Sequence, residues 1–133
     1  LAEREGEIWI GTDGGGINIL DPETRRFSLL EHMPGSDNYS LPANSILCLY
    51  NDCNNNMWAG SIRNGLISIR EVSMKTYTDV PPGNDRGLSN NTVLSLFQES
   101  QDQIWVGTDG GGINSFNPLT EKFIHYPSTW EDK

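Results

Sequence analysis

The sequence "IWIGTDGGGIN", Ile8 to Asn18, runs from strand-forming residues into three glycines and then returns to an apolar residue. It recurs almost unchanged as "IWVGTDGGGIN", Ile104 to Asn114. Apolar, β-branched and aromatic residues on both sides of a short glycine segment predict a β-hairpin, because glycine readily adopts the positive φ angles of tight turns. The chain therefore carries the same predicted hairpin twice.

The two hairpins belong to a longer repeat. Placing Trp9 on Trp105 aligns residues 7–30 with residues 103–126 without a gap. The matching positions include the tryptophan, the acidic glycine turn, a proline and a phenylalanine. Two copies of one structural unit are therefore present.

A third copy lies between these two. The segment "LPANSILCLYNDCNNNMWAGSIRNGLISI" from Leu41 matches "LSNNTVLSLFQESQDQIWVGTDGGGINSF" from Leu88 at a constant offset of 47 residues. The repeated tryptophans are spaced by 49 and 47 residues, at Trp9, Trp58 and Trp105. This spacing falls in the range of β-propeller blades.

Each copy contains short strand candidates separated by polar or glycine turns, and no stretch holds a helical period. In the last copy the candidates are Thr92 to Glu99, Gln103 to Thr108, Gly112 to Asn117 and Lys122 to Tyr126. The sequence predicts an all-β fold, a partial β-propeller of about three blades with four antiparallel strands each. The first copy lacks the segment that precedes the other two, so we expect the first blade to lack its leading strand.

We expect one domain over residues 1–133, divided into a partial blade at 7–31 and blades at 44–79 and 91–127. The repeated tryptophans are predicted to fill the seams between neighbouring blades, because a single sheet cannot bury both faces alone. The alternative is an aromatic platform for sugar binding. Trp130 lies outside the repeat and is the expected exposed tryptophan.

Composition restricts the partners. The 133 residues carry 18 acidic and 9 basic side chains, for a formal net charge of -9. This balance argues against binding to nucleic acid and against adhesion to anionic lipid. No apolar run approaches the length of a membrane span. Cys48 and Cys53 are five residues apart, and an extended backbone would hold them beyond the reach of a disulfide, so we expect two free thiols.

The pattern of Leu-Ser-Asn-Asn-Thr-Val from Leu88, Ile-Trp-Val-Gly-Thr from Ile104, Gly-Gly-Ile-Asn, and Asn117-Pro118 ahead of Phe123 closely resembles the two-component regulator propeller repeat. The resemblance covers nearly the whole chain. The resemblance implies the periplasmic sensor region of a hybrid two-component system of the type found in Bacteroidetes. In such proteins seven-bladed propellers precede an immunoglobulin-like domain, a membrane helix and a histidine kinase. It further implies that the ligands are breakdown products of complex polysaccharides.

Other motifs give no site. The turns at Asp13 and Asp109 are similar to the Asp- and Gly-rich turns that hold calcium, but they offer too few oxygens. Their glycines lead into a strand and not into a helix N-terminus, which argues against phosphate binding. His32 and His125 are not placed for a catalytic triad. We therefore expect no metal, no cofactor and no catalytic residue, with a propeller-type glycan lyase or hydrolase as a less favoured alternative.

Residues 31–44 and 79–91 form long loops that join one blade to the next, and propeller loops share a rim with the strand hairpins. Aromatic, amide, acidic and guanidinium groups on this rim suit sugars or uronates. Ligand contacts are therefore expected among Asn38, Tyr39, Arg63, Asn64, Arg86 and Asp109. The alternative is that these loops are only solvated connectors.

The sequence thus predicts a ligand-sensing propeller segment, periplasmic, that is not itself an enzyme. The alternative is a non-catalytic structural or dimerisation module of the same receptor. Three blades should leave apolar faces exposed at both ends of the array, within residues 7–30 and 92–126. We expect these faces to pack on the remainder of a parent propeller or on copies of this chain as a homo-oligomer. Neither nucleic acid nor the membrane is an expected direct partner.

Overall fold

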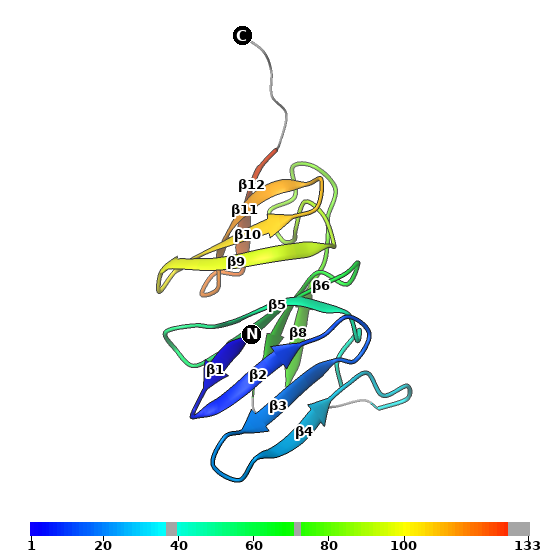
Figure 1. The fold of residues 1–133 in the computed structure, drawn as a ribbon. Helices are drawn as coiled ribbons and strands as arrows, with labels where there is room; N and C mark the ends of the chain where they lie inside the picture. Colours follow the sequence, from blue (N-terminus) through cyan, green and yellow to red (C-terminus); the bar gives the residue numbers. More distant parts are fainter. Residues whose placement is uncertain (37–39, 71–72, 128–133) are drawn as a thin grey trace.

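The computed structural model describes residues 1–36, 40–70 and 73–127, which form three four-stranded sheets arranged in chain order (Figure 1). Sheet 1 holds β1 (Ala2–Arg4), β2 (Glu7–Gly11), β3 (Ile17–Asp21) and β4 (Arg26–Leu30). Sheet 2 holds β5 (Ile46–Asn51), β6 (Met57–Ser61), β7 (Leu66–Ile69) and β8 (Met74–Tyr77). Sheet 3 holds β9 (Val93–Ser100), β10 (Gln103–Thr108), β11 (Gly112–Asn117) and β12 (Lys122–Tyr126).

Every sheet follows the same meander, in which each strand pairs antiparallel with the next strand in the sequence. The leading strands lie side by side, since β5 contacts β1 and β2 of sheet 1 and β9 of sheet 3. The all-β, blade-by-blade architecture predicted from the repeat is confirmed. In the last copy three predicted strands match β10, β11 and β12, and the first is shifted by one residue.

The expectation that the first blade lacks its leading strand is wrong. The strand β1 pairs with β2 from Ala2 opposite Trp9 to Arg4 opposite Glu7. The two residues between these strands, Glu5 and Gly6, both have positive φ, at 53° and 84°. This conformation makes a two-residue hairpin turn. A strand of three residues needs no long signature sequence, so the absent repeat motif did not exclude it.

The glycine hairpins form as predicted. Thr12 N–H donates to the Gly16 carbonyl at 3.0 Å, which closes the turn between β2 and β3. In the middle copy Ser61 N–H donates to the Gly65 carbonyl at 3.1 Å. Gly65 has a φ of 76°, and a Cβ there would overlap the backbone carbonyl of Tyr77. One glycine at this position is therefore enough to close the hairpin where the other two are replaced.

Two separate apolar cores fill the two seams. The core between sheets 1 and 2 is built around Trp9, which is 4% exposed, and the core between sheets 2 and 3 is built around Trp58, which is 2% exposed. In the second core Phe116 meets Trp58 edge-to-face at 5.4 Å between ring centroids and stacks on Phe123 at 4.4 Å. The seam assignment is confirmed for these two tryptophans.

For the third tryptophan the seam assignment is wrong. Trp105 is only half-buried, on the face of sheet 3 that turns away from sheet 2, because no further sheet covers that face in the described structure. The predicted exposure of apolar faces at both ends is confirmed by Phe27 and Leu29 in sheet 1 and by Phe97 and Ile124 in sheet 3, each more than half exposed. Trp130 lies outside the described residues.

Both cysteines are free, as predicted. Cys48 lies on β5 beside the second seam, where its thiol is near the Val93 carbonyl. Burial raises the pKa of the Cys48 thiol to about 11. Cys53 lies in the turn after β5 and is exposed. Cys48 therefore lies at the second seam, and Cys53 lies in an exposed turn.

Candidate functional site

In sheets 1 and 2, the hairpin between the second and third strands is bound by the segment that leads into the next sheet. In sheet 1, the amides of Gly14 and Gly16 donate to the backbone carbonyl of Asn44, at 3.1 and 2.8 Å. The Ser45 hydroxyl adds a hydrogen bond of 2.8 Å to the carboxylate of Asp13. We call this set of contacts the hairpin clasp.

The hairpin clasp repeats at the second seam. The Gly65 amide donates to the Asn91 carbonyl at 2.7 Å, and the Arg63 amide donates to the Thr92 hydroxyl at 3.2 Å. Leu41 and Leu88, three residues before the clasping asparagines, are fully buried in the first and second cores. The shared sequence Leu-x-x-Asn-[Ser/Thr]-[Ile/Val] is therefore the element that fixes one blade to the next.

Three of the predicted ligand residues lie at this hairpin end. Arg63 and Asn64 lie in the β6–β7 hairpin, and Asp109 lies in the β10–β11 hairpin, with Arg63 and Asp109 exposed. The segment that leads into sheet 3 runs between these two hairpins. Its Asn91 and Thr92 bind the β6–β7 hairpin. Its Ser89 and Asn90 lie close to Gly111 in the β10–β11 hairpin. Asn38 and Tyr39 lie outside the described residues.

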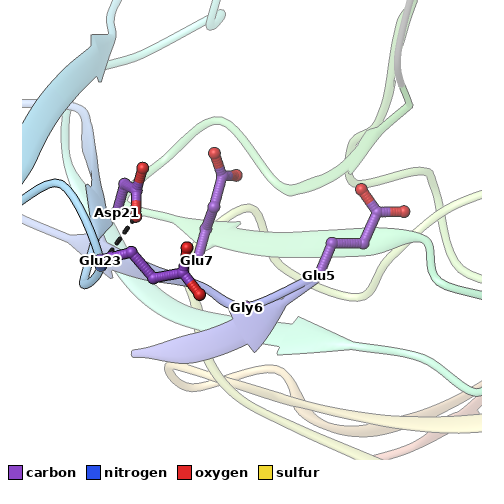
Figure 2. Close-up of a pocket in the computed structure, with 5 residues that line it drawn as sticks. All are labelled: Glu5, Gly6, Glu7, Asp21 and Glu23. Carbon is purple, nitrogen blue, oxygen red and sulfur yellow. Dashed lines mark hydrogen bonds between the residues drawn. The ribbon is translucent and has the colours of Figure 1, made fainter.

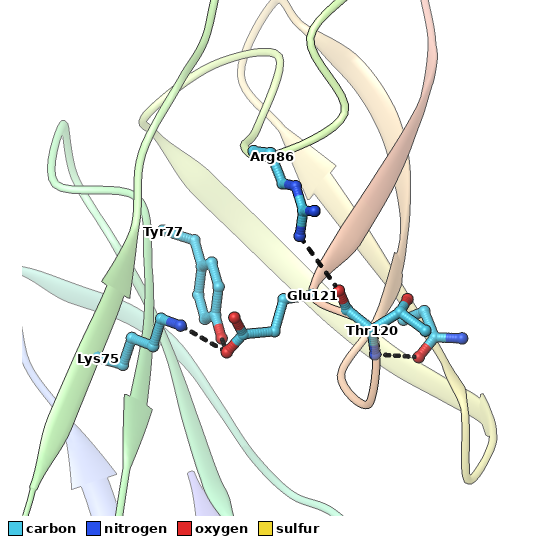
Figure 3. Close-up of polar contacts among 6 residues, drawn as sticks. Lys75, Tyr77, Arg86, Thr120 and Glu121 are labelled. Atoms are coloured by element: carbon cyan, nitrogen blue, oxygen red, sulfur yellow. Dashed lines mark hydrogen bonds and ion pairs between the residues drawn. The ribbon is translucent and has the colours of Figure 1, made fainter.

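Arg86 is not brought to that end. Its guanidinium reaches the backbone carbonyl of Thr120 at 3.5 Å, in the turn between β11 and β12 at the opposite end of sheet 3 (Figure 3). The loop around it is fixed there, because Phe123 N–H donates to the Asp85 carbonyl at 2.8 Å and Lys122 pairs with the Asp85 carboxylate at 3.1 Å. The expectation that Arg86 shares a rim with the hairpin residues is therefore not met.

Around Arg86 the structure forms a groove between sheets 2 and 3 (Figure 3). Glu121, from the β11–β12 turn, accepts a hydrogen bond from Lys75 at 2.5 Å and another from the Tyr77 hydroxyl at 2.9 Å. Both donors lie on β8, the last strand of sheet 2. The carboxylate therefore ties the edge of one sheet to a turn of the next.

The protonation states in this groove follow from these contacts. The hydrogen bond from Lys75, followed by that from Tyr77, lowers the pKa of Glu121 below its ordinary value. Burial is the largest cause that raises the pKa of Tyr77, and its hydrogen bond to the Glu121 carboxylate adds to it. At neutral pH Glu121 is therefore a carboxylate and Tyr77 a neutral phenol.

Sequence reasoning did not identify Lys75, Tyr77 or Glu121. Glu121 is separated in sequence from Tyr77 by 44 positions and from Lys75 by 46 positions, and it lies on a different sheet. No local sequence motif predicts a contact of this kind. One signal was available in the repeat. A tyrosine ends the last strand of both sheet 2 and sheet 3, with Tyr77 opposite Leu66 and Tyr126 opposite Ile113.

A second hollow lies on sheet 1 and is acidic (Figure 2). Glu5, Glu7, Asp21 and Glu23 line it. The Asp21 carboxylate already accepts hydrogen bonds from the Thr24 hydroxyl at 2.7 Å and the Glu23 amide at 2.9 Å, and the Thr24 contacts are the main cause that lowers its pKa. Within the described residues, no three His, Cys, Asp or Glu side chains are grouped to hold a metal ion.

Both histidines have structural partners. The His32 ring lies 2.6 Å from the Leu41 carbonyl, and the His125 ring lies 2.7 Å from the Gly87 carbonyl. A carbonyl only accepts, so each ring nitrogen donates its proton to the backbone. Each contact holds a segment that joins two sheets. The part of the chain with described coordinates contains no helix long and apolar enough to cross a membrane.

Comparisons with known proteins identify the repeat. Residues 87–110 match the family described as two component regulator propeller, which confirms the predicted resemblance over that segment. The match spans the lead-in segment, β9, β10 and the start of the following hairpin. No curated protein matches the chain.

Solved structures share the fold. Two extracellular domains from B. thetaiotaomicron, both described as parts of hybrid two component systems, superpose with TM-scores of 0.76 and 0.75 at 18% and 19% identity over 96% of this chain. The chain covers 17% and 16% of their lengths. PorZ, a surface component of the type-IX secretion system of Porphyromonas gingivalis, superposes with a TM-score of 0.53 at 14% identity. That match covers 98% of this chain and 27% of PorZ.

Proposed function

Starting from a chain that carries a two component regulator propeller repeat at residues 87–110, we propose that it is a ligand-sensing segment in the periplasmic sensor region of a hybrid two-component histidine kinase. The repeat match is the observation that carries the proposal. The fold shared with two extracellular domains described as hybrid two component systems supports it. The segment binds and does not catalyse, and the histidine contacts described above support this role.

The proposed ligands are oligosaccharides released from complex polysaccharides. Two surfaces suit them. The β6–β7 hairpin presents the exposed Arg63 next to Asn64, and the β10–β11 hairpin presents the exposed Asp109, so the two hairpins offer a cation, an amide and a carboxylate. The groove at Lys75, Tyr77 and Arg86 has a volume of about 280 Å³, near the lower end of ligand pockets, roughly 300 to 1,000 Å³, and so suits one sugar unit of a longer chain.

Binding should be tested by calorimetric titration of the chain with neutral oligosaccharides and with oligosaccharides that contain uronates. We expect saturable binding to at least one of them, weakened about tenfold or more by Arg63→Ala or by Arg86→Ala, because a guanidinium pairs with carboxylate and hydroxyl groups of a sugar. Arg26→Ala is the matched control, since it removes an exposed arginine from sheet 1. Binding that is unchanged in both test variants would refute these residues as contacts.

A second function is favoured by one observation. Lys75, Arg86 and Glu121 all have partners within the chain, and these partners lie on neighbouring sheets or loops. Such contacts between sheets of one chain favour the structural alternative, a non-catalytic module that holds the receptor together. If no oligosaccharide binds while Glu121→Gln lowers the thermal midpoint, the structural function replaces the sensing one.

A further inference from the structure

Two opposite charges lie side by side at the end of sheet 1, on the face that turns toward sheet 2. Arg4 of β1 is directly opposite Glu7 of β2, and opposed residues of an antiparallel pair project from the same face. Glu7 is two positions before Trp9 of the first core, so its side chain lies on the Trp9 face. Within the described residues, neither Arg4 nor Glu7 has an ion-pair partner.

Arg4 takes the position of an acid in the other two copies. In sheets 2 and 3, the residue two positions after the tryptophan's strand partner is Asp52 or Glu99, and it accepts the indole N–H at 2.8 or 2.7 Å. In sheet 1 this residue is Arg4, whose guanidinium carbon lies 5.7 Å from the centroid of the Trp9 ring. Arg4 is 9% exposed, and its Nε and the Trp9 Nε1 are buried with no hydrogen-bond partner within the described residues. An oxyanion could accept from both donors, as the carboxylates of the other copies accept from their indoles.

Two carboxylates lie beside Arg4. Glu7 and Asp21 line both of two hollows on sheet 1, of about 340 and 350 Å³ (Figure 2). The third copy has amides at these positions, Gln103 and Asn117. Asn117 accepts from two backbone amides of its turn at 2.9 and 3.1 Å, as Asp21 does at 2.9 and 3.3 Å. The turn therefore does not need the negative charge of Asp21.

From this arrangement we infer that the end of sheet 1 binds a free apolar α-amino acid. The ligand's carboxylate accepts from the Arg4 guanidinium and from the Trp9 indole, the two buried donors that have no partner. Its ammonium pairs with the Glu7 carboxylate, which lies opposite Arg4 at the roughly 5 Å spacing of cross-strand neighbours. An α-amino acid carries both charges on one carbon atom and so spans this pair.

The neighbouring charges decide against simpler ligands. A plain carboxylate would be repelled by Glu7 and Asp21, and a plain amine would be repelled by Arg4. A zwitterion has no net charge, so the chain's formal net charge of -9 does not exclude it. Ile19 and Phe27 line the larger hollow, which suits an apolar ligand side chain. The site shares no residue with the surfaces of the proposed function and does not rest on it.

The test is calorimetric titration of the full chain with L-leucine at constant ionic strength. We expect saturable binding that is at least about tenfold weaker for N-acetyl-L-leucine, which lacks the ammonium, and for L-leucinamide, which lacks the carboxylate. The indole N–H signal of Trp9 should shift during the titration, while that of Trp58 in the second core should not. The inference is overturned if L-leucine does not bind, or if both blocked derivatives bind as tightly as L-leucine.

Two variants locate the binding. Arg4→Gln and Glu7→Gln each remove one charge and keep a polar side chain, and each should weaken L-leucine binding at least about tenfold. Glu3→Gln is the matched control, because Glu3 lies opposite Ile8 on the other face of the same strands, and its affinity should not change. Glu7 is only half-buried, so Glu7→Gln should fold even if Arg4→Gln does not. Unchanged affinity in Glu7→Gln overturns the inference.

Discussion

Trp58 and Trp105 occupy the same position of the repeat, 47 residues apart, yet Trp58 is buried and Trp105 is only half-buried. Trp58 is covered by Tyr77 of its own sheet and by Phe116 and other core residues of sheet 3, and its indole N–H donates to the buried Asp52 at 2.8 Å. Trp105 packs on Tyr126, and its indole N–H donates to the exposed Glu99. The repeat sequence therefore specifies a surface, and only the presence of a neighbouring blade turns that surface into a core.

The sharpest contrast is in stability. Trp58→Ala should lower the free energy of unfolding by roughly 3 to 5 kcal/mol, because it leaves a cavity in the second core. Trp105→Ala should cost about 1 kcal/mol, since the side chain is already partly solvated. Denaturant midpoints of the two variants measure the difference. Equal losses would mean that Trp105, on the face of sheet 3 that turns away from sheet 2, is packed as tightly as Trp58 in the second core.

A second contrast lies in the hairpins. Gly65→Ala should cost roughly 2 to 5 kcal/mol, since the new Cβ overlaps the Tyr77 carbonyl and the backbone has positive φ. Gly110 also has positive φ, 81°, but no atom lies near its missing Cβ. Gly110→Ala should therefore cost only about 1 to 2 kcal/mol, the strain alone. Thermal unfolding of both variants tests this, and a larger loss at Gly110 would contradict the free space around its missing Cβ.

The two cysteines give the same contrast in reactivity. At pH 8 the Cys48 thiol should react with a disulfide reagent far more slowly than Cys53, because burial raises the pKa of Cys48 to about 11 and only the thiolate attacks. Cys53→Ser should remove the fast phase, and Cys48→Ser the slow one. Two fast phases in the folded chain would show that the second seam opens readily.

The smallest expected effect concerns the groove between sheets 2 and 3. Hydrogen bonds from Lys75 and Tyr77 lower the pKa of Glu121 from its ordinary 4.5, so its contribution to stability is full above pH 4.5 and is lost as the pH falls through the folded-state value. Glu121→Gln should flatten the acid limb of a stability–pH curve slightly. Glu23→Gln, on sheet 1, serves as the control. If the acid limb is identical in the unmodified chain and in Glu121→Gln, the Glu121 carboxylate does not contribute to stability.

Much of the fold could be predicted because its signals are local and repeated. The strands β10 to β12 match their predicted limits, since alternating apolar residues and glycine turns mark both ends. The strand β1 was missed because three residues and a Glu5-Gly6 turn carry no repeated pattern. The open state of Trp105 was missed because a tryptophan's burial depends on the sheet beside it, which its own sequence does not encode.

The site was harder to predict for a different reason. The signature was recognised, but the clasp uses the backbone carbonyls of Asn44 and Asn91, which any residue possesses. Their side chains have another partner, the amides of His32 and Asp79, at 2.6 Å in both cases. The contact of Glu121 with Lys75 depends on the angle between two sheets. That angle follows from how the sheets pack, and the local sequence around either residue does not predict it.

The central claim is that a neighbouring blade turns the tryptophan surface of the repeat into a core. Hydrogen exchange at the tryptophan indoles tests it most directly, because it compares Trp58 with Trp105 in the same unmodified chain. The account predicts that the Trp58 indole exchanges at least about a hundredfold more slowly than the Trp105 indole, since it is released only when the second seam opens. Protection of Trp105 equal to that of Trp58 would contradict the account, because the face of sheet 3 that turns away from sheet 2 would then be covered.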